Sequence, residues 1–221
     1  MASAVQAQRD YVKWTFFGAL ALCLVAVIYA DERFLILPNH PEWKHIAPFK
    51  WLLLPHGIFG LVALLSGPLQ FSDTIRRERP RLHRWTGYVY ITAVAIAAPL
   101  ALSITLAGFE PRTIYVEQYF QAGLWFLTTA FALICILSRN IAAHKRWMMR
   151  SYGFALVFIL SRVPDAVPGF KWNDQLLGDV LWSLVVLALV APDVILTVRE
   201  LAGARRRRAA VSAGAAISNA A

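Results

Sequence analysis

The chain has 221 residues, of which 58% are hydrophobic and 16% charged, and its formal net charge at pH 7 is +9. A water-soluble domain of this length does not carry so large an apolar fraction, so the composition excludes an ordinary soluble enzyme and predicts one integral membrane domain. The two cysteines, Cys23 and Cys135, lie inside apolar stretches without a partner pattern, which indicates buried small residues.

Six segments are apolar enough to cross a bilayer, for which about 20 residues are needed. In chain order they are about residues 12–30, 49–69, 83–107, 119–137, 146–163 and 176–198. The first is interpreted as a retained helix, because no small-residue cleavage site follows it. The sequence therefore predicts an all-α bundle of six transmembrane helices over residues 1–203. A basic and then small-residue tail over 204–221 is expected to be disordered.

The basic residues alternate from loop to loop. Sixteen of the 22 Lys and Arg precede the first span, separate the second from the third and the fourth from the fifth, or follow the sixth. By the positive-inside rule, this distribution predicts that both termini face the cytoplasm, here at a bacterial inner membrane. The four arginines at 205–208 fit the same role, so the positive charge indicates the lipid bilayer rather than nucleic acid as the partner.

Three histidines lie near the ends of predicted spans. A metal-ligating side chain at membrane depth is costly to keep there, so it is a functional candidate. His83 opens the third span and His144 precedes the fifth, and both are therefore expected in one cytoplasmic layer. His56, seven residues into the second span, is expected about 10 Å below the outer surface. The sequence thus separates a histidine pair from a third, distant histidine.

Two imidazoles from facing helices are the usual axial ligands of a membrane b-type haem. His83 shares a helix face with Gly87 and Tyr90, and His144 shares one with Trp147 and Ser151. These faces favour a haem between the third and fifth spans. Histidines beside basic residues also occur as ordinary interfacial chemistry, and this alternative stays open.

Arginine side chains are expected at the same depth in the membrane as His83 and His144. Their planar fork is well suited to the carboxylates of haem propionates. The candidates for this role are Arg84, Arg146 and Arg150.

A stripe of small residues follows His56 along the second span. Its members, at helical spacing, are His56, Gly60, Ala63, Gly67 and Gln70. Such a stripe accommodates either a neighbouring helix or a flat ring, and the sequence leaves both open.

Charged residues also lie near the ends of the last two spans. Arg162 and Asp179 are expected at similar outer depth, either as a structural ion pair or as a polar site with His56 for a quinone, a second haem or a proton. Asp193, near the cytoplasmic end of the sixth span, is expected to pair with Arg150 or Arg84 or to relay protons.

Three stretches, "HG…G…GPLQF", "RRERPRLHRWTGYVY" and "HKRWMMRSY…SR", resemble the bacterial family of predicted membrane proteins called domain of unknown function 2306. The resemblance covers roughly residues 50 to 165 and implies a membrane fold without assigning an activity. It points to His56, Gly67, Gln70, His83, Arg84, Gly87, Tyr90, His144, Trp147, Arg150 and Arg162. More distantly, the layout is similar to six-helix b-type membrane cytochromes, which carry four histidines as two pairs. This chain departs from that pattern, because it has three well-placed histidines, which leaves a single cytoplasmic-side haem or none.

The leading hypothesis is a b-type haem electron-transfer protein, such as a membrane oxidoreductase subunit, that exchanges electrons with a quinone or a redox partner protein. Three alternatives stay open. The first is a metal-handling or oxidase-assembly protein in which His83, His144 and His56 bind copper or iron without porphyrin. The others are a transporter with a polar cavity and a purely structural membrane subunit. The sequence leaves the electron donor and the oligomeric state undetermined.

Overall fold

The computed structural model describes residues 11, 15, 17–25, 43–109, 111–167 and 169–218, and within them every regular element is a helix. The α-helices and the short 3-10 helices (η) are, in chain order, α2 (Trp43–Ile46), η2 (Ala47–Phe49), α3 (Lys50–Gln70), α4 (Asp73–Glu78), α5 (Pro80–Leu106), η3 (Arg112–Ile114), α6 (Tyr115–Leu137), α7 (Ile141–Arg162), η4 (Val163–Ala166) and α8 (Asp174–Ser218). The predicted all-α class is confirmed for this part of the chain.

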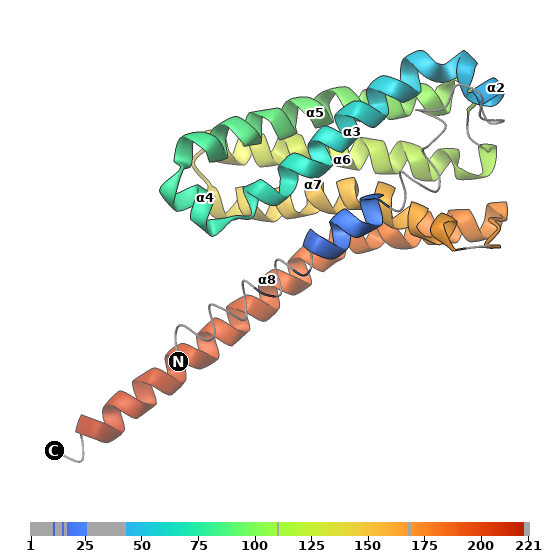
Figure 1. Ribbon diagram of the computed structural model, residues 1–221. Coiled ribbons are helices and arrows are strands. Elements are labelled where there is room, and N and C mark those ends of the chain that lie inside the picture. Colours follow the sequence, from blue (N-terminus) through green and yellow to red (C-terminus); the bar gives the residue numbers. More distant parts are fainter. Residues whose placement is uncertain are drawn as a thin grey trace.

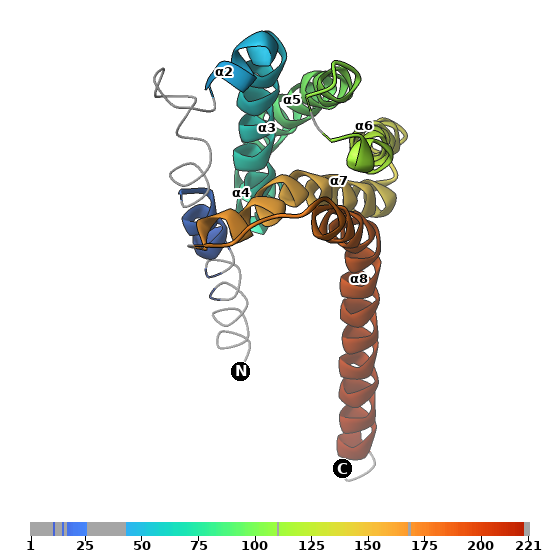
Figure 2. The same cartoon turned by 90° about the vertical axis from the view of Figure 1, so that its right-hand side faces the viewer.

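Four long helices, α3, α5, α6 and α7, form an up-and-down bundle, and α8 packs along the outside of α7 (Figure 1, Figure 2). Helices α3 and α6 run in one direction, whereas α5 and α7 run in the other. We call the end with α4 and the α6–α7 turn the α4 end, and the opposite end, with α2, η3 and η4, the α2 end.

The α6–α7 turn reverses the chain within three residues. Arg139 adopts a left-handed backbone conformation (φ 58°) after the end of α6. Asn140 then caps α7, because its side-chain oxygen accepts a hydrogen bond from the Ala143 N–H (3.1 Å). This tight connection places the start of α7 at the same end of the bundle as the start of α5.

Small side chains bring the helices close together. Ala93 and Ala97 of α5 and Ala132 of α6 are buried. At Gly153 of α7, an added Cβ would lie 3.1 Å from the backbone of Ala188 on α8. Because lipid is as apolar as a leucine side chain, membrane helices associate through such close van der Waals packing.

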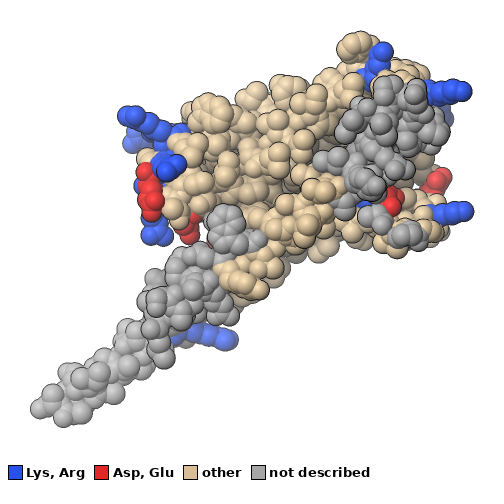
Figure 3. Space-filling model, viewed as in Figure 1, with Lys and Arg blue, Asp and Glu red and all other residues tan. Residues whose placement is uncertain are grey.

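Four helical stretches of the described chain have the length and composition of membrane spans: Trp43–Gln70, Pro80–Leu106, Arg112–Leu137 and Asp174–Arg205. They contain the second, third, fourth and sixth predicted spans. On the face shown in Figure 3, charged side chains gather at the two ends of the bundle and leave the length between them uncharged. Which end faces the cytoplasm stays a sequence-based prediction.

The fifth predicted span corresponds to α7, which has 22 residues and runs between the same two ends. Its composition does not identify it as a span, because it contains Lys145, Arg146, Arg150 and Arg162. Helix α7 packs against α3, α6 and α8, and this central position gives its polar residues protein neighbours. The six-span count stays a prediction.

The structure describes residues 15 and 17–25 of the first predicted span, 12–30, and these residues are helical. Leu20, Cys23 and Leu24 pack against the hydrophobic core, so this segment contributes to the bundle.

The structure differs from the sequence-based expectation of a disordered tail over 204–221. Helix α8 continues to Ser218 and projects beyond the bundle at the α4 end (Figure 1). The segment is rich in alanine and arginine, which are among the strongest helix formers. Its biased composition therefore favoured helix as well as disorder.

Candidate functional site

His83 and His144 lie at the α4 end, in the first turns of the parallel helices α5 and α7. Seven residues further along each helix, the side-chain oxygens of Tyr90 and Ser151 are hydrogen-bonded at 2.7 Å. A step of seven residues returns to nearly the same helix face about 10 Å along the axis. The two histidines therefore lie on the same two helix faces, one such step nearer the α4 end.

The Nδ1 atoms of the two histidine rings differ in their hydrogen bonding. His144 Nδ1 lies 2.8 Å from the Ala132 carbonyl oxygen. Because a carbonyl only accepts, Nδ1 carries a proton, and in the neutral ring Nε2 is then the nitrogen with the lone pair. In His83, Nδ1 is buried and has no hydrogen-bond partner among the described residues. A histidine that ligates a metal usually donates its other N–H to a carbonyl, which is the arrangement of His144.

His56 belongs to a different layer. Its Nδ1 donates to the Ala97 carbonyl oxygen (2.9 Å), and its Nε2 is therefore unprotonated. Ala97 lies 14 residues beyond His83 on α5, which corresponds to about 21 Å. The three histidines thus do not form one metal site, and the described residues contain no group of three or more His, Cys, Asp or Glu suited to an ion.

The small residues of α3 do not leave room for a flat ring at Gly67. The ring of Tyr152 fills the space beside this glycine, where an added Cβ would lie 2.2 Å from its Cε2 atom. On α5, the Gln70 side chain covers Gly87 in the same way and donates from Nε2 to Thr86 Oγ1 (2.6 Å). Of the two alternatives that the sequence left open for the stripe, the packing at Gly67 favours a neighbouring helix over a flat ring.

Two of the three arginines expected to hold propionates are engaged by α8. Arg150 pairs with Asp193 (2.5 Å) and stacks over Trp147, with its Cζ 4.7 Å from the ring centroid. Arg146 pairs with Glu200 (3.2 Å). These ion pairs tie α7 to α8 at the α4 end. They also occupy the guanidinium groups, so Arg146 and Arg150 would have to exchange a partner to bind a propionate.

The Arg150–Asp193 pair is expected to contribute measurably to stability. The Arg150 side chain is 18% exposed and the Asp193 side chain 49%, so the pair is better shielded from water than the Arg146–Glu200 pair. In a double-mutant cycle with Arg150→Met and Asp193→Asn, we expect a coupling energy of about 1 kcal/mol or more. The matched cycle at Arg146 and Glu200, which are 51% and 65% exposed, should give about 0.2–1 kcal/mol. Thermal unfolding in detergent measures both, and equal couplings would contradict the prediction.

Three other candidate positions lie apart from the histidine pair. Arg84 is exposed on α5. Asp179 is exposed on α8, and the ion pairs formed within the described chain do not join it to Arg162. Arg162 instead lies over the Phe158 ring (5.9 Å from Cζ to the centroid) and acts electrostatically on His56. The outer polar site stays a prediction.

Sequence reasoning missed the role of Thr129. Its Oγ1 atom lies 2.6 Å from Ser151 Oγ, and Ser151 in turn contacts the Tyr90 hydroxyl. A signal was available, because Thr128 and Thr129 interrupt the apolar run of α6. Glu200 was missed as well, because its partner depends on where α8 lies beside α7.

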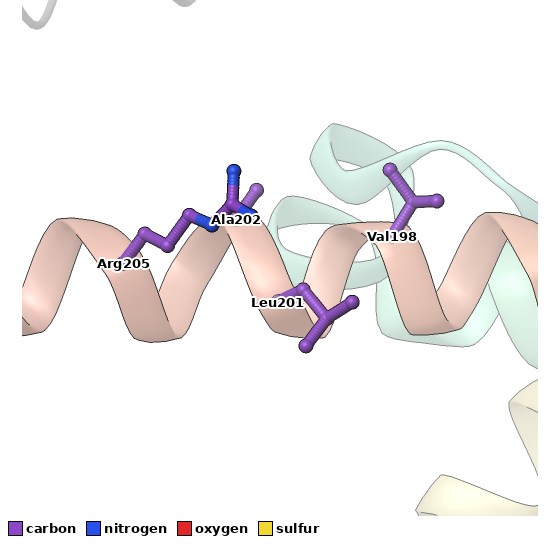
Figure 4. Close-up of a pocket in the computed structure, with 4 residues that line it drawn as sticks. All are labelled: Val198, Leu201, Ala202 and Arg205. Carbon is purple, nitrogen blue, oxygen red and sulfur yellow. The ribbon is translucent and has the colours of Figure 1, made fainter.

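Two depressions of the described surface have no histidine among the residues that line them. One is on α8, and Figure 4 shows that Val198, Leu201, Ala202 and Arg205 all come from this single helix. The other lies along α4, from Thr74 to Leu82. Neither is lined by a candidate site residue, so neither is the polar cavity that a transporter would need.

The comparison with protein families agrees with the apolar, membrane-spanning character of the helices. No curated protein and no solved structure matches the chain. A family described as "Predicted membrane protein (DUF2306)" matches residues 53–197, which is more than half of the chain and reaches from α3 into α8. The match includes His56, His83 and His144 but assigns no haem and no activity. The chain belongs to this family of predicted membrane proteins.

Proposed function

We propose that this membrane protein binds a b-type haem between α5 and α7, with His83 and His144 as the axial ligands. The observation that carries the proposal is the placement of two imidazoles on parallel helices, one seven-residue step below the Tyr90–Ser151 hydrogen bond. Bundles of four helices commonly hold cofactors between side chains that project inward from facing helices.

The donor atoms present suit a haem iron. Iron accepts neutral imidazole nitrogen, and His144 presents an unprotonated Nε2 atom because its Nδ1 donates to Ala132. His83 has a buried ring nitrogen without a partner among the described residues, which is a cost that ligation or a new hydrogen bond would remove. A haem supplies one-electron redox chemistry.

The chain's own groups would orient and tune such a cofactor. The Ala132 carbonyl fixes the His144 ring and makes its free nitrogen more basic. Arg84 is exposed at the level of His83 and has a guanidinium suited to a propionate. The buried Tyr90 and Ser151 close the bundle above the pair and keep water out on that side. As electron partner we propose a quinone from the bilayer or a redox protein.

A visible spectrum of the detergent-purified protein, oxidised and then reduced with dithionite, tests this function. We expect a sharp reduced-minus-oxidised α-band from protein that has been expressed with ample haem. A flat spectrum from such protein would rule out the haem assignment.

The close packing at Gly67 and Gly87 favours a second candidate, a bare metal ion held by the same pair. An ion between two Nε2 atoms needs no space beside α3. Imidazole binds copper and iron well, so the protein would then handle metal without porphyrin. Elemental analysis of the same sample distinguishes the two candidates, because copper near one per chain with a flat visible spectrum supports only the second.

A further inference from the structure

Three hydroxyl groups from three helices meet in the centre of the bundle. We call Tyr90 of α5, Thr129 of α6 and Ser151 of α7 the hydroxyl cluster. Ser151 Oγ lies 2.7 Å from the Tyr90 hydroxyl and 2.6 Å from Thr129 Oγ1. Ser151 and Tyr90 are completely buried, and Thr129 is nearly so. A single serine oxygen therefore connects three helices at one level.

Most other hydroxyl groups of these helices bond within their own helix. Thr128, the neighbour of Thr129, donates to the Leu124 carbonyl oxygen, and Ser161 of α7 donates to the Phe158 carbonyl oxygen. Ser151 differs because its two described partners belong to other helices. A buried polar group between membrane helices fixes their relative position, since shifting a helix would leave the group unsatisfied in an apolar surrounding.

The position of the cluster links it to the histidines. His83 and His144 lie one seven-residue step from Tyr90 and Ser151 on the same two faces, about 10 Å along the axis. His144 is also bonded to Ala132, which follows Thr129 by three residues on α6. The same three helices thus hold both the cluster and the pair. A slip of α7 against α5 or α6 at Ser151 would change the distance between the two rings.

We propose that Ser151 is a positioning residue: its two hydroxyl contacts set the register of α5, α6 and α7 and thereby hold His83 and His144 at the separation that one metal centre requires. The part that concerns the metal centre rests on the proposed function. The part that concerns helix register is independent of the proposed function, because helix register is measured without any ligand.

The chain provides matched controls for this proposal. Ser151→Ala removes the bridging hydroxyl, and Ser161→Ala removes a buried hydroxyl of the same helix that bonds only within it. Thr129→Val and the neighbouring Thr128→Val form the same kind of comparison on α6. Tyr90→Phe deletes one hydroxyl without changing the ring, and it serves as the second test if Ser151→Ala does not fold.

The distance between the starts of α5 and α7 reports register directly. Spin labels are attached to cysteines at the exposed positions Arg81 and Lys145, with Cys23 and Cys135 replaced by alanine, and the distance distribution is recorded in detergent without added cofactor. We expect Ser151→Ala, Thr129→Val and Tyr90→Phe to shift or broaden the distribution. Ser161→Ala and Thr128→Val should leave it unchanged.

Two results would overturn the proposal: an unchanged distribution in Ser151→Ala and Tyr90→Phe, or equal broadening in Ser151→Ala and Ser161→Ala. If the wild-type protein binds haem, the affinity of Ser151→Ala should also fall about ten-fold, the lower range for residues that support a ligand. If the wild-type protein shows no haem band, the proposed function fails, whereas the spin-label distances still decide whether Ser151 sets the register.

Discussion

His83→Ala and His144→Ala are each expected to abolish the reduced-minus-oxidised α-band of the purified protein. Each variant removes one of the two facing imidazoles at the α4 end. Loss of a residue that supports a metal ligand typically lowers the affinity for the metal about ten- to 100-fold. Loss of the ligand itself should cost more, so we expect haem affinity to fall by more than about 100-fold. Haem content per chain and the difference spectrum measure the loss.

The chain offers two histidine controls for this experiment. His45 is exposed in α2 at the other end of the bundle and stacks on Phe109 at a centroid distance of 4.9 Å, so His45→Ala should keep the band. His56 is bonded to Ala97 at a level about 21 Å from His83 along α5, and His56→Ala should keep it as well. If His83→Ala retained full haem content, the axial assignment would be wrong. Loss of the band in His56→Ala alone would move the haem to the outer layer.

The depth of each histidine along the bundle axis could be predicted from the sequence, because it depends only on the position of the residue within its span. Alternating hydrophobic segments fix which residues start a span, and His83 and His144 both start helices that run away from the same end. The seven-residue spacing to Tyr90 and to Ser151 was also visible in the sequence. That these two residues touch became known only from the structure, in which the Tyr90 side chain of α5 reaches Ser151 of α7.

The partners of the arginines depend on which helices are neighbours, and a single sequence does not contain this information. Asp193 was recognised as one member of a pair, but the choice between Arg150 and Arg84 required the position of α8 beside α7. Glu200 was not recognised, because it lies beyond the predicted end of the last span. Its pairing with Arg146 follows from the continuation of α8 as a helix.

The small stripe of α3 shows the same limit. Gly60 and Gly67 are equivalent in sequence pattern, since both are glycines on one helix face. In the structure, a Cβ added at Gly60 would have no neighbour within 4 Å apart from the adjacent turns of its own helix. At Gly67, the ring of Tyr152 occupies the corresponding space. The pattern allows either a neighbouring helix or a flat ring there, and only the packing of α7 identifies the neighbour as a tyrosine ring.

Gly67→Ala is therefore expected to destabilise the bundle, whereas Gly60→Ala should not. The new Cβ would lie 2.2 Å from Cε2 and 2.3 Å from Cδ2 of Tyr152. The ring cannot simply swing away, because its hydroxyl donates to the Leu64 carbonyl oxygen (3.3 Å) and its face packs near Phe71 (5.4 Å between centroids). Overpacking of this kind costs about 1–3 kcal/mol, which thermal unfolding in detergent detects.

Tyr152→Leu provides the compensating change, because it removes the ring atoms that the new methyl group would meet. The double variant Gly67→Ala/Tyr152→Leu should be more stable than the sum of the two single effects predicts. Additive effects, or equal unfolding temperatures for Gly67→Ala and Gly60→Ala, would show that the ring is not held against α3. Space for a planar cofactor beside Gly67 would then exist, and the balance between a haem and a bare metal ion at the histidine pair would shift toward haem.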